Sequence, residues 1–139
     1  MGSEPKVAII TGASRGIGQA LVKGYRDRNF RVVANSRSIR PSSDPDVLAV
    51  AGDIADPKTA ERIVSQALEC FGRVDTLVNN AGIFVAKPFT DYTDEDYANA
   101  LGINLTGRQA KNVISFLIRR AAVGHERLLR ANSGRSKVR

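Results

Sequence analysis

The 139-residue sequence predicts an α/β fold, a doubly wound parallel sheet that is incomplete at its C-terminal side. Two observations carry this prediction. Short runs of apolar, often β-branched residues alternate with longer segments of helical period, which is the pattern of parallel strands joined by crossover helices. A glycine-rich turn at residues 11–18 also follows the first apolar run directly and leads into a helical pattern, as the first crossover of such a sheet does.

Each strand is predicted from an apolar run bounded by turn residues, and each helix from an apolar stripe with a boundary signal. The predicted strands are residues 7–11, 31–35, 47–51 and 73–79. The predicted helices are residues 16–28, 57–71 and 94 to beyond 104. Asp56 and Pro57 give the second helix an N-cap and a first residue, and Gly72 ends it. Thr93 and Asp96 form a capping-box pattern before the third helix.

Apolar periodicity predicts which helix faces are buried. In the first helix, Ile17, Ala20, Leu21 and Gly24 fall on one face. Cys70 lies within the helical pattern of the second helix, so we expect a core or half-buried thiol. As the single cysteine, it excludes a disulfide framework within the chain.

Charge divides the chain into two regions. Residues 1–107, the predicted dinucleotide-binding region, have a net charge of −1, whereas residues 108–139 carry nine Lys and Arg against one acid, for a net charge of +8. This basic segment keeps a helical period to about residue 122 and then becomes rich in Arg, Ser and Gly, which predicts a helix followed by disorder. No apolar run is long enough to span a membrane and no signal peptide is visible, so we expect a cytoplasmic protein.

The glycine-rich turn predicts a phosphate-binding cradle of the Rossmann-like kind. Its three glycines allow a tight turn and a close approach of the backbone to phosphate oxygens. The helix that begins there directs unpaired N–H groups and a partial positive charge at the anion. The predicted cofactor-binding residues of this turn are Gly12, Ser14, Arg15, Gly16, Ile17 and Gly18.

The segment after the second strand predicts which dinucleotide binds. Dinucleotide folds that prefer NAD place an acid there to hold the ribose 2′-hydroxyl, but residues 35–38 read Asn-Ser-Arg-Ser. Arg37 suits a 2′-phosphate instead, because a guanidinium donates paired, charge-assisted hydrogen bonds to phosphate. We therefore favour NADP(H) over NAD(H) and include Ser36 and Arg37 in the site. The alternative is that Arg37 is a solvated loop residue.

Four elements of the sequence resemble, in order, those of the short-chain dehydrogenase/reductase family. The turn reads T-G-x-x-x-G-x-G, Asp53 follows the third strand, Asn-Asn-Ala-Gly at residues 79–82 ends the fourth, and Asn104 precedes Leu-Thr-Gly. The resemblance covers about residues 5–107 and then stops. It implies an NAD(P)-dependent oxidoreductase that transfers hydride between the cofactor and an alcohol or carbonyl compound.

The resemblance also implies roles for the residues that carry it. Asp53 would accept a hydrogen bond from the adenine amino group and Ile54 would pack on the adenine ring, although a turn-capping aspartate is the alternative for Asp53. Asn79 would hold the sheet together. Three further residues would bring backbone close to the cofactor ribose: Asn80, Ala81 and Gly82.

Of the family's catalytic tetrad, the sequence contains only the asparagine, Asn104. The family uses a Ser and a Tyr-x-x-x-Lys, in which the lysine lies on the same helical face as the tyrosine and favours its ionised form. None of the three tyrosines, Tyr25, Tyr92 and Tyr97, is followed four residues later by lysine. We therefore expect the chain to be inactive alone, as the product of a truncated or frame-shifted gene.

Other interpretations remain beside this one. The same cradle would serve a non-catalytic NADP(H)-binding module. The basic segment could bind nucleic acid or an anionic membrane, but it has a single aromatic residue, Phe116. A metal site is not expected, because His125 is the only histidine and has no cluster of Cys or acidic residues around it. Family members usually form homo-oligomers, and the sequence does not identify the substrate.

Overall fold

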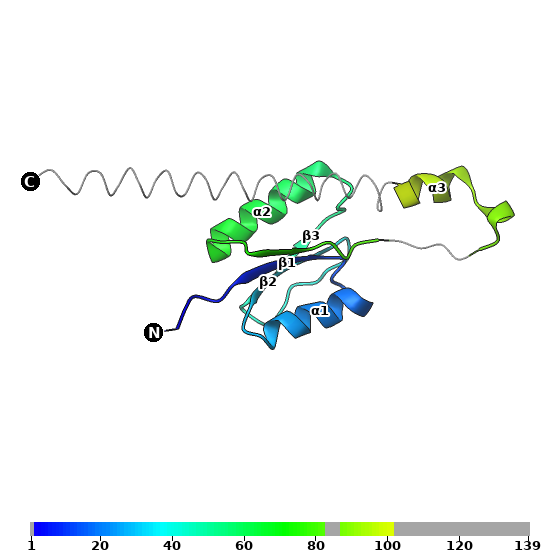
Figure 1. The fold of residues 1–139 in the computed structure, drawn as a ribbon. Helices are drawn as coiled ribbons and strands as arrows, with labels where there is room; N and C mark the ends of the chain where they lie inside the picture. Colours follow the sequence, from blue (N-terminus) through cyan, green and yellow to red (C-terminus); the bar gives the residue numbers. More distant parts are fainter. Residues whose placement is uncertain (1, 83–86, 102–139) are drawn as a thin grey trace, which may run out of the picture.

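The chain builds a parallel sheet with one helix on each face (Figure 1). The computed structural model describes residues 2–82 and 87–101. The strands are β1 (Val7–Thr11), β2 (Arg31–Ser36), β3 (Val47–Ala51) and β4 (Thr76–Val78). The helices are α1 (Gly16–Arg26), α2 (Pro57–Phe71) and α3 (Asp94–Leu101), with a 3₁₀ turn, η1 (Phe89–Asp91), before α3. The predicted strands and helices are therefore present, but β4 is shorter than residues 73–79.

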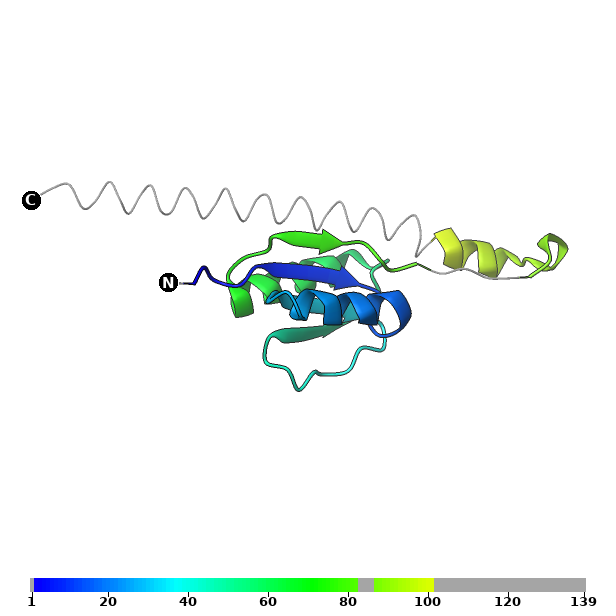
Figure 2. The ribbon, with the colours of Figure 1, turned by 60° about the horizontal axis from the view of Figure 1, so that its bottom comes forward.

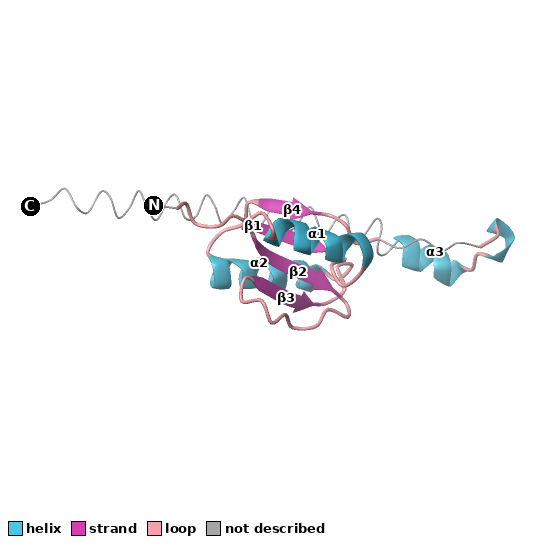
Figure 3. Cartoon of the chain, turned by 90° about the horizontal axis from the view of Figure 1, so that it is seen from below, coloured by secondary structure: helices cyan, strands magenta, loops and turns pink. Residues whose placement is uncertain are grey.

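The strand order is β3-β2-β1-β4, and every neighbouring pair is parallel (Figure 3). The arrowheads consequently point the same way, and the carboxyl ends of the strands lie at one edge of the sheet (Figure 2). The chain proceeds outward from β1 to β3 and then returns to place β4 on the other side of β1. Ligands of open α/β sheets bind in the crevice at such a reversal of strand order, outside the carboxyl ends.

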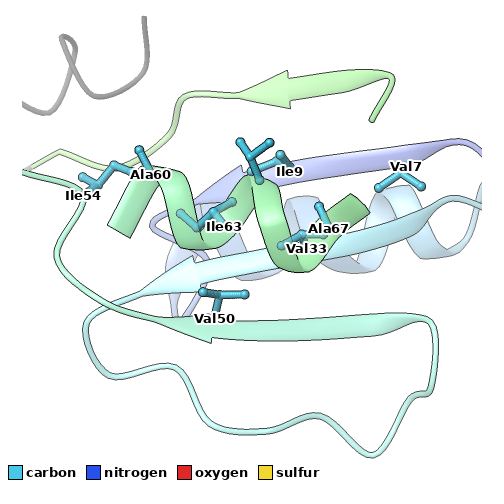
Figure 4. Close-up of a cluster of buried hydrophobic side chains, with 9 residues drawn as sticks. Val7, Ile9, Val33, Val50, Ile54, Ala60, Ile63 and Ala67 are labelled. Carbon is cyan, nitrogen blue, oxygen red and sulfur yellow. The ribbon is translucent and has the colours of Figure 1, made fainter. Parts of the chain in front are cut away.

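Alternate residues of the central strands supply two separate apolar layers. Val7 and Ile9 of β1 pack with Val33 and Val50 against α2, which contributes Ile63 and its apolar neighbours (Figure 4). On the opposite face, Ile10, Val32 and Ala34 pack against α1. β1 is buried along its whole length, from Val7 to Thr11. A strand that is buried on both faces needs a nearly continuous apolar sequence, and this explains the apolar run of β1.

The buried face of α1 differs from the predicted one. Ile17 is 74 % exposed and Ala20 is also exposed, so these two residues do not face the sheet. The inward stripe instead starts at the buried Gly18 and continues through residues 21, 22 and 25, at helical spacing. The close approach of Gly18 to the end of β1 sets the rotation of the helix and shifts the stripe by one residue.

Local boundary signals of the other helices are confirmed. Asp56 Oδ1 accepts a hydrogen bond from Lys58 N at 3.0 Å, and Gly72 ends α2 with a left-handed φ of 74°. Thr93 and Asp96 form the reciprocal hydrogen bonds of a capping box.

Cys70 is exposed, contrary to expectation, because the buried stripe of α2 passes through neighbouring positions. The predicted continuation of α3 past residue 104 lies outside the described residues.

Candidate functional site

A cavity of about 510 Å³ opens at the carboxyl edge of the sheet. Its volume falls within the range of roughly 300–1,000 Å³ that is usual for ligand sites. All thirteen residues predicted to bind the cofactor line it, together with three that were not predicted, Asn35, Ser38 and Gly52. The structure thus brings together segments from four different strand ends, which is what the topology requires. Asn104, the predicted catalytic residue, lies outside the described residues.

The glycine-rich turn is shaped by three positions where a side chain would be excluded or strained. Gly12 and Gly16 have left-handed φ values of 66° and 55°, which favour glycine. A Cβ on Gly12 would lie 2.9 Å from Ala81 Cα, and one on Gly18 would lie 1.9 Å from the Gly12 carbonyl oxygen. A Cβ on Gly16 would meet nothing within 4 Å, so this glycine faces open space. The turn is therefore tight towards the protein and open towards the cavity.

The first turn of α1 presents uncapped N–H groups to this cavity. The N-cap residue is Arg15, whose extended backbone (φ −158°, ψ 169°) makes no side-chain cap hydrogen bond, and the first turn has no acidic residue. Most helices satisfy these donors with a Ser, Thr, Asp or Asn side chain. An uncapped N-terminus with a partial positive charge is suited to hold an anionic group of a ligand.

A hydrogen-bond network fixes the end of β1 to the segment after β4. Thr11 Oγ1 accepts from Asn80 N at 3.2 Å and from Ala81 N at 3.1 Å. Asn80 Nδ2 donates to the carbonyl oxygens of Thr11 and Gly12 at 3.2 and 3.1 Å. The side chain that ties the strands is therefore that of Asn80, whereas Asn79, for which we predicted this role, is exposed.

Asn35 performs a similar function between β2 and β3, and sequence reasoning missed it. Its buried side-chain amide donates to Val50 O at 2.9 Å and to Gly52 O at 3.2 Å, and the backbone carbonyl oxygen of Asn35 accepts from Ala13 N. A polar amide within an apolar, β-branched run was the signal that could have found it. The neighbouring Ser36 Oγ is buried beside the cavity without a hydrogen-bond partner among the described residues.

The segment after β3 supplies an aspartate and an apolar side chain. Asp53 Oδ1 accepts from Ala55 N at 2.9 Å, so this carboxylate does cap its own turn, as in the alternative interpretation, and it also lines the cavity. Ile54 is 4 % exposed and packs in the core cluster beneath α2 (Figure 4), so little of its surface is left for a ligand.

The residues around the cavity have features that suit an anionic, phosphate-containing ligand. The open side of the glycine turn, the uncapped helix and the unpartnered Ser36 hydroxyl are features that a phosphate-containing ligand would use. Asp53 is the only acid in the lining of this cavity, whereas two exposed arginines, Arg15 and Arg37, also line it.

Within residues 2–82 and 87–101 there is no group of three His, Cys, Asp or Glu side chains that could hold a metal ion. No helix in this part of the chain is long and apolar enough to cross a membrane.

Comparison with known proteins agrees with this geometry. A family model for short chain dehydrogenases matches residues 6–122, and the chain belongs to this family. The match includes the first part of the basic segment and passes the point near Gly107 where the motif resemblance was expected to end. L-rhamnose 1-dehydrogenase (NAD(P)(+)) of Azotobacter vinelandii is 38 % identical over 115 residues, which cover 73 % of this chain and 45 % of that protein.

Solved structures share the same fold. A short-chain dehydrogenase/reductase from Serratia marcescens superposes with a TM-score of 0.69 at 34 % identity, covering 84 % of this chain and 52 % of the other. A 3-ketoacyl-(acyl-carrier-protein) reductase from Brucella melitensis, complexed with NADH, gives a TM-score of 0.71 at 33 % identity, with coverages of 77 % and 47 %. The chain spans about half the length of the curated relatives that it matches.

Proposed function

We propose that this chain binds NADP(H) in the cavity at the carboxyl edge of the sheet, as the cofactor-binding half of an NAD(P)-dependent oxidoreductase. The observation that carries the proposal is the uncapped start of α1 behind a turn with two left-handed glycines, which lines the cavity. Backbone N–H groups of this turn would hold the pyrophosphate. When bound, the nicotinamide ring would donate or accept a hydride.

The preference for NADP(H) rests on the end of β2. Ser36 stands where an acid would repel a 2′-phosphate, and Arg37 follows it with an exposed guanidinium. Arg15 lies on the other side of the same cavity and adds positive charge. One relative of this chain is named for both NAD and NADP, so membership of the family does not by itself support either cofactor, and the proposal depends on these local side chains.

The substrate class is proposed from the family alone: an alcohol to be oxidised or a carbonyl compound to be reduced. The 139 residues contain no Tyr-x-x-x-Lys, so we propose that the proton transfer that accompanies hydride transfer needs residues outside this sequence. A shifted reading frame remains a hypothesis for the basic segment. Because the family model matches the chain as far as residue 122, we place any shift of the reading frame after residue 122. Cytoplasmic location and self-association stay predictions.

Isothermal titration of the 139-residue chain with NADPH and with NADH tests the cofactor proposal. We expect the wild-type chain to bind NADPH more tightly, and Arg37→Ala to weaken NADPH binding by about tenfold with little change for NADH, as loss of a charge-assisted bond predicts. Arg28→Ala is the matched control, because Arg28 is also exposed but donates to the Gly24 carbonyl at the far end of α1. Failure of both nucleotides to bind, or equal binding that Arg37→Ala leaves unchanged, would overturn the proposal.

A further inference from the structure

A second cavity, of about 440 Å³, adjoins the first one beside the start of α1. It is lined mainly by polar and basic residues of the glycine-rich turn, of α1 and of the loop that follows β2. These residues are Ala13, Ser14, Arg15, Gln19, Ser38, Ile39, Arg40 and Ser42. Ser14, Arg15 and Ser38 also line the first cavity, so the two cavities share a wall. No acidic residue is present in the lining of the second cavity.

The arginines of the described chain fall into two groups. Eight arginines occur in residues 2–82 and 87–101, and five of them donate hydrogen bonds to carboxylates or carbonyl oxygens elsewhere in the fold. The other three have no hydrogen-bond or ion-pair partner in that part of the chain, and all three line the adjoining cavities: Arg15, Arg37 and Arg40. Guanidinium groups that have no partner within the described part of the protein and that line two joined cavities favour an anionic ligand there.

The acids of the same loop do not cancel this charge. Arg26 donates to Asp44 at 2.8 Å and to Asp46 at 3.1 Å, and Arg31 donates to Asp46 at 3.3 Å. The bond from Arg26 holds the pKa of the Asp44 carboxyl below its usual value. Both carboxylates are thus engaged at the far end of the loop, where they also brace it against the end of α1. Along the chain, Arg40 lies between Ser38 of the shared wall and these two carboxylates, and it lines the second cavity.

We propose that Arg40 is a further specificity-determining residue, which holds the adenosine 2′-phosphate of NADP(H) from the side opposite Arg37. An anion at the shared wall would meet Arg15 and Ser38 directly, with Arg37 on the side of the first cavity and Arg40 on the side of the second. Two guanidinium groups that enclose one phosphate donate to different oxygens, and each adds to the selection against a ribose with a free 2′-hydroxyl. This inference rests on the proposed NADP(H) function.

The test is titration of wild type, Arg40→Ala and the control Arg28→Ala with NADPH and NADH, repeated with 2′-phospho-ADP-ribose and ADP-ribose. We expect Arg40→Ala to lower the affinity for the two 2′-phosphorylated probes by about five- to tenfold, as loss of a partly solvated charged hydrogen bond predicts. The affinity for NADH and ADP-ribose should stay within about twofold of wild type. Arg40→Lys should recover part of the lost affinity, because lysine keeps the positive charge but cannot donate two parallel hydrogen bonds as a guanidinium does. Thermal unfolding of each variant checks that the fold is retained.

The outcomes separate this inference from the function on which it rests. If wild type prefers NADPH and Arg37→Ala abolishes the preference, but Arg40→Ala changes nothing, the role of Arg40 is refuted and the NADP(H) function stands. If Arg40→Ala lowers the affinity for all four probes equally, Arg40 shapes the loop and does not select the 2′-phosphate. That result also refutes the inference. If the wild-type chain binds no nucleotide, the proposed function fails and the inference fails with it.

Discussion

Gly18→Ala is expected to destabilise the fold, although alanine is the better helix former. In an unhindered helix the change would stabilise the protein by about 0.5–1 kcal/mol. At this position, however, the new Cβ would lie 1.9 Å from the Gly12 carbonyl oxygen and 2.7 Å from Asn80 Nδ2. The first contact is with backbone, so it cannot be relieved by the rotation of a flexible side chain.

The magnitude follows from how far the backbone must move. To reach an ordinary contact, the start of α1 and the end of β1 must separate by roughly 1.5 Å, which is overpacking at the upper end of the usual range of about 1–3 kcal/mol. The movement would also strain the bonds from Asn80 Nδ2 to the Thr11 and Gly12 carbonyl oxygens. We therefore expect the free energy of unfolding to fall by about 3 kcal/mol and nucleotide binding to be lost.

Urea unfolding followed by far-ultraviolet circular dichroism measures this change. Gly24→Ala is the matched control, since it lies in the same helix and its Cβ would meet only Arg28 Nη1, at 3.8 Å. That variant should be more stable than wild type by about 0.5–1 kcal/mol, as helix propensity alone predicts. If Gly18→Ala proves as stable as Gly24→Ala, the close approach of α1 to β1, and the explanation for the shifted helix face, would be refuted.

Three further predictions concern the strand ends and the chemistry. Thr11→Val should lower the free energy of unfolding by about 2 kcal/mol in urea titrations, because the N–H groups of Asn80 and Ala81 lose their acceptor. Thr11→Ser keeps a hydroxyl acceptor, so its free energy of unfolding should fall by less than half as much. Acid should weaken the fold, because hydrogen bonds from Arg73 and Val7 N hold the pKa of the Asp75 carboxyl below its ordinary value. This stabilisation is complete above the unfolded pKa and is lost as the pH falls through the lowered folded pKa. Urea titrations should therefore show a smaller difference between Asp75→Asn and wild type at pH 3 than at pH 7. The purified chain should not oxidise NADPH above the blank rate with simple aldehydes or ketones, and measurable turnover would contradict the assignment of proton transfer to residues outside the sequence.

Much of the fold was predictable because its signals are local. β1 and β3 have the predicted bounds, since each is a continuous apolar run bounded by turn residues, and β1 is buried on both faces as such a run predicts. The start and end of α2 follow from Asp56, Pro57 and Gly72, whose conformational preferences act within a few residues. The predicted cofactor residues lie around one cavity because the carboxyl ends of parallel strands meet at one edge.

What the sequence did not predict depends on contacts between distant segments. The rotation of α1 is set by the contact of Gly18 with Gly12, which helical periodicity alone does not contain. Asn79 and Asn80 are chemically identical, and only the position of the Thr11 and Gly12 carbonyl oxygens decides which amide ties the strands. The second cavity was likewise invisible, because its basic residues come from the turn before α1 and from the loop after β2.

The most direct test of the central claim is a map of amide chemical-shift changes when NADPH is added to the ¹⁵N-labelled 139-residue chain. The cavity predicts shifts concentrated in residues 12–18, 36–38, 52–54 and 80–82, with the outer face of α2 unchanged and with smaller changes at 36–38 when NADH replaces NADPH. Shifts confined to the basic segment 108–139, and equal for any polyphosphate, would contradict the claim and would instead indicate unspecific attraction of an anion to a positively charged tail.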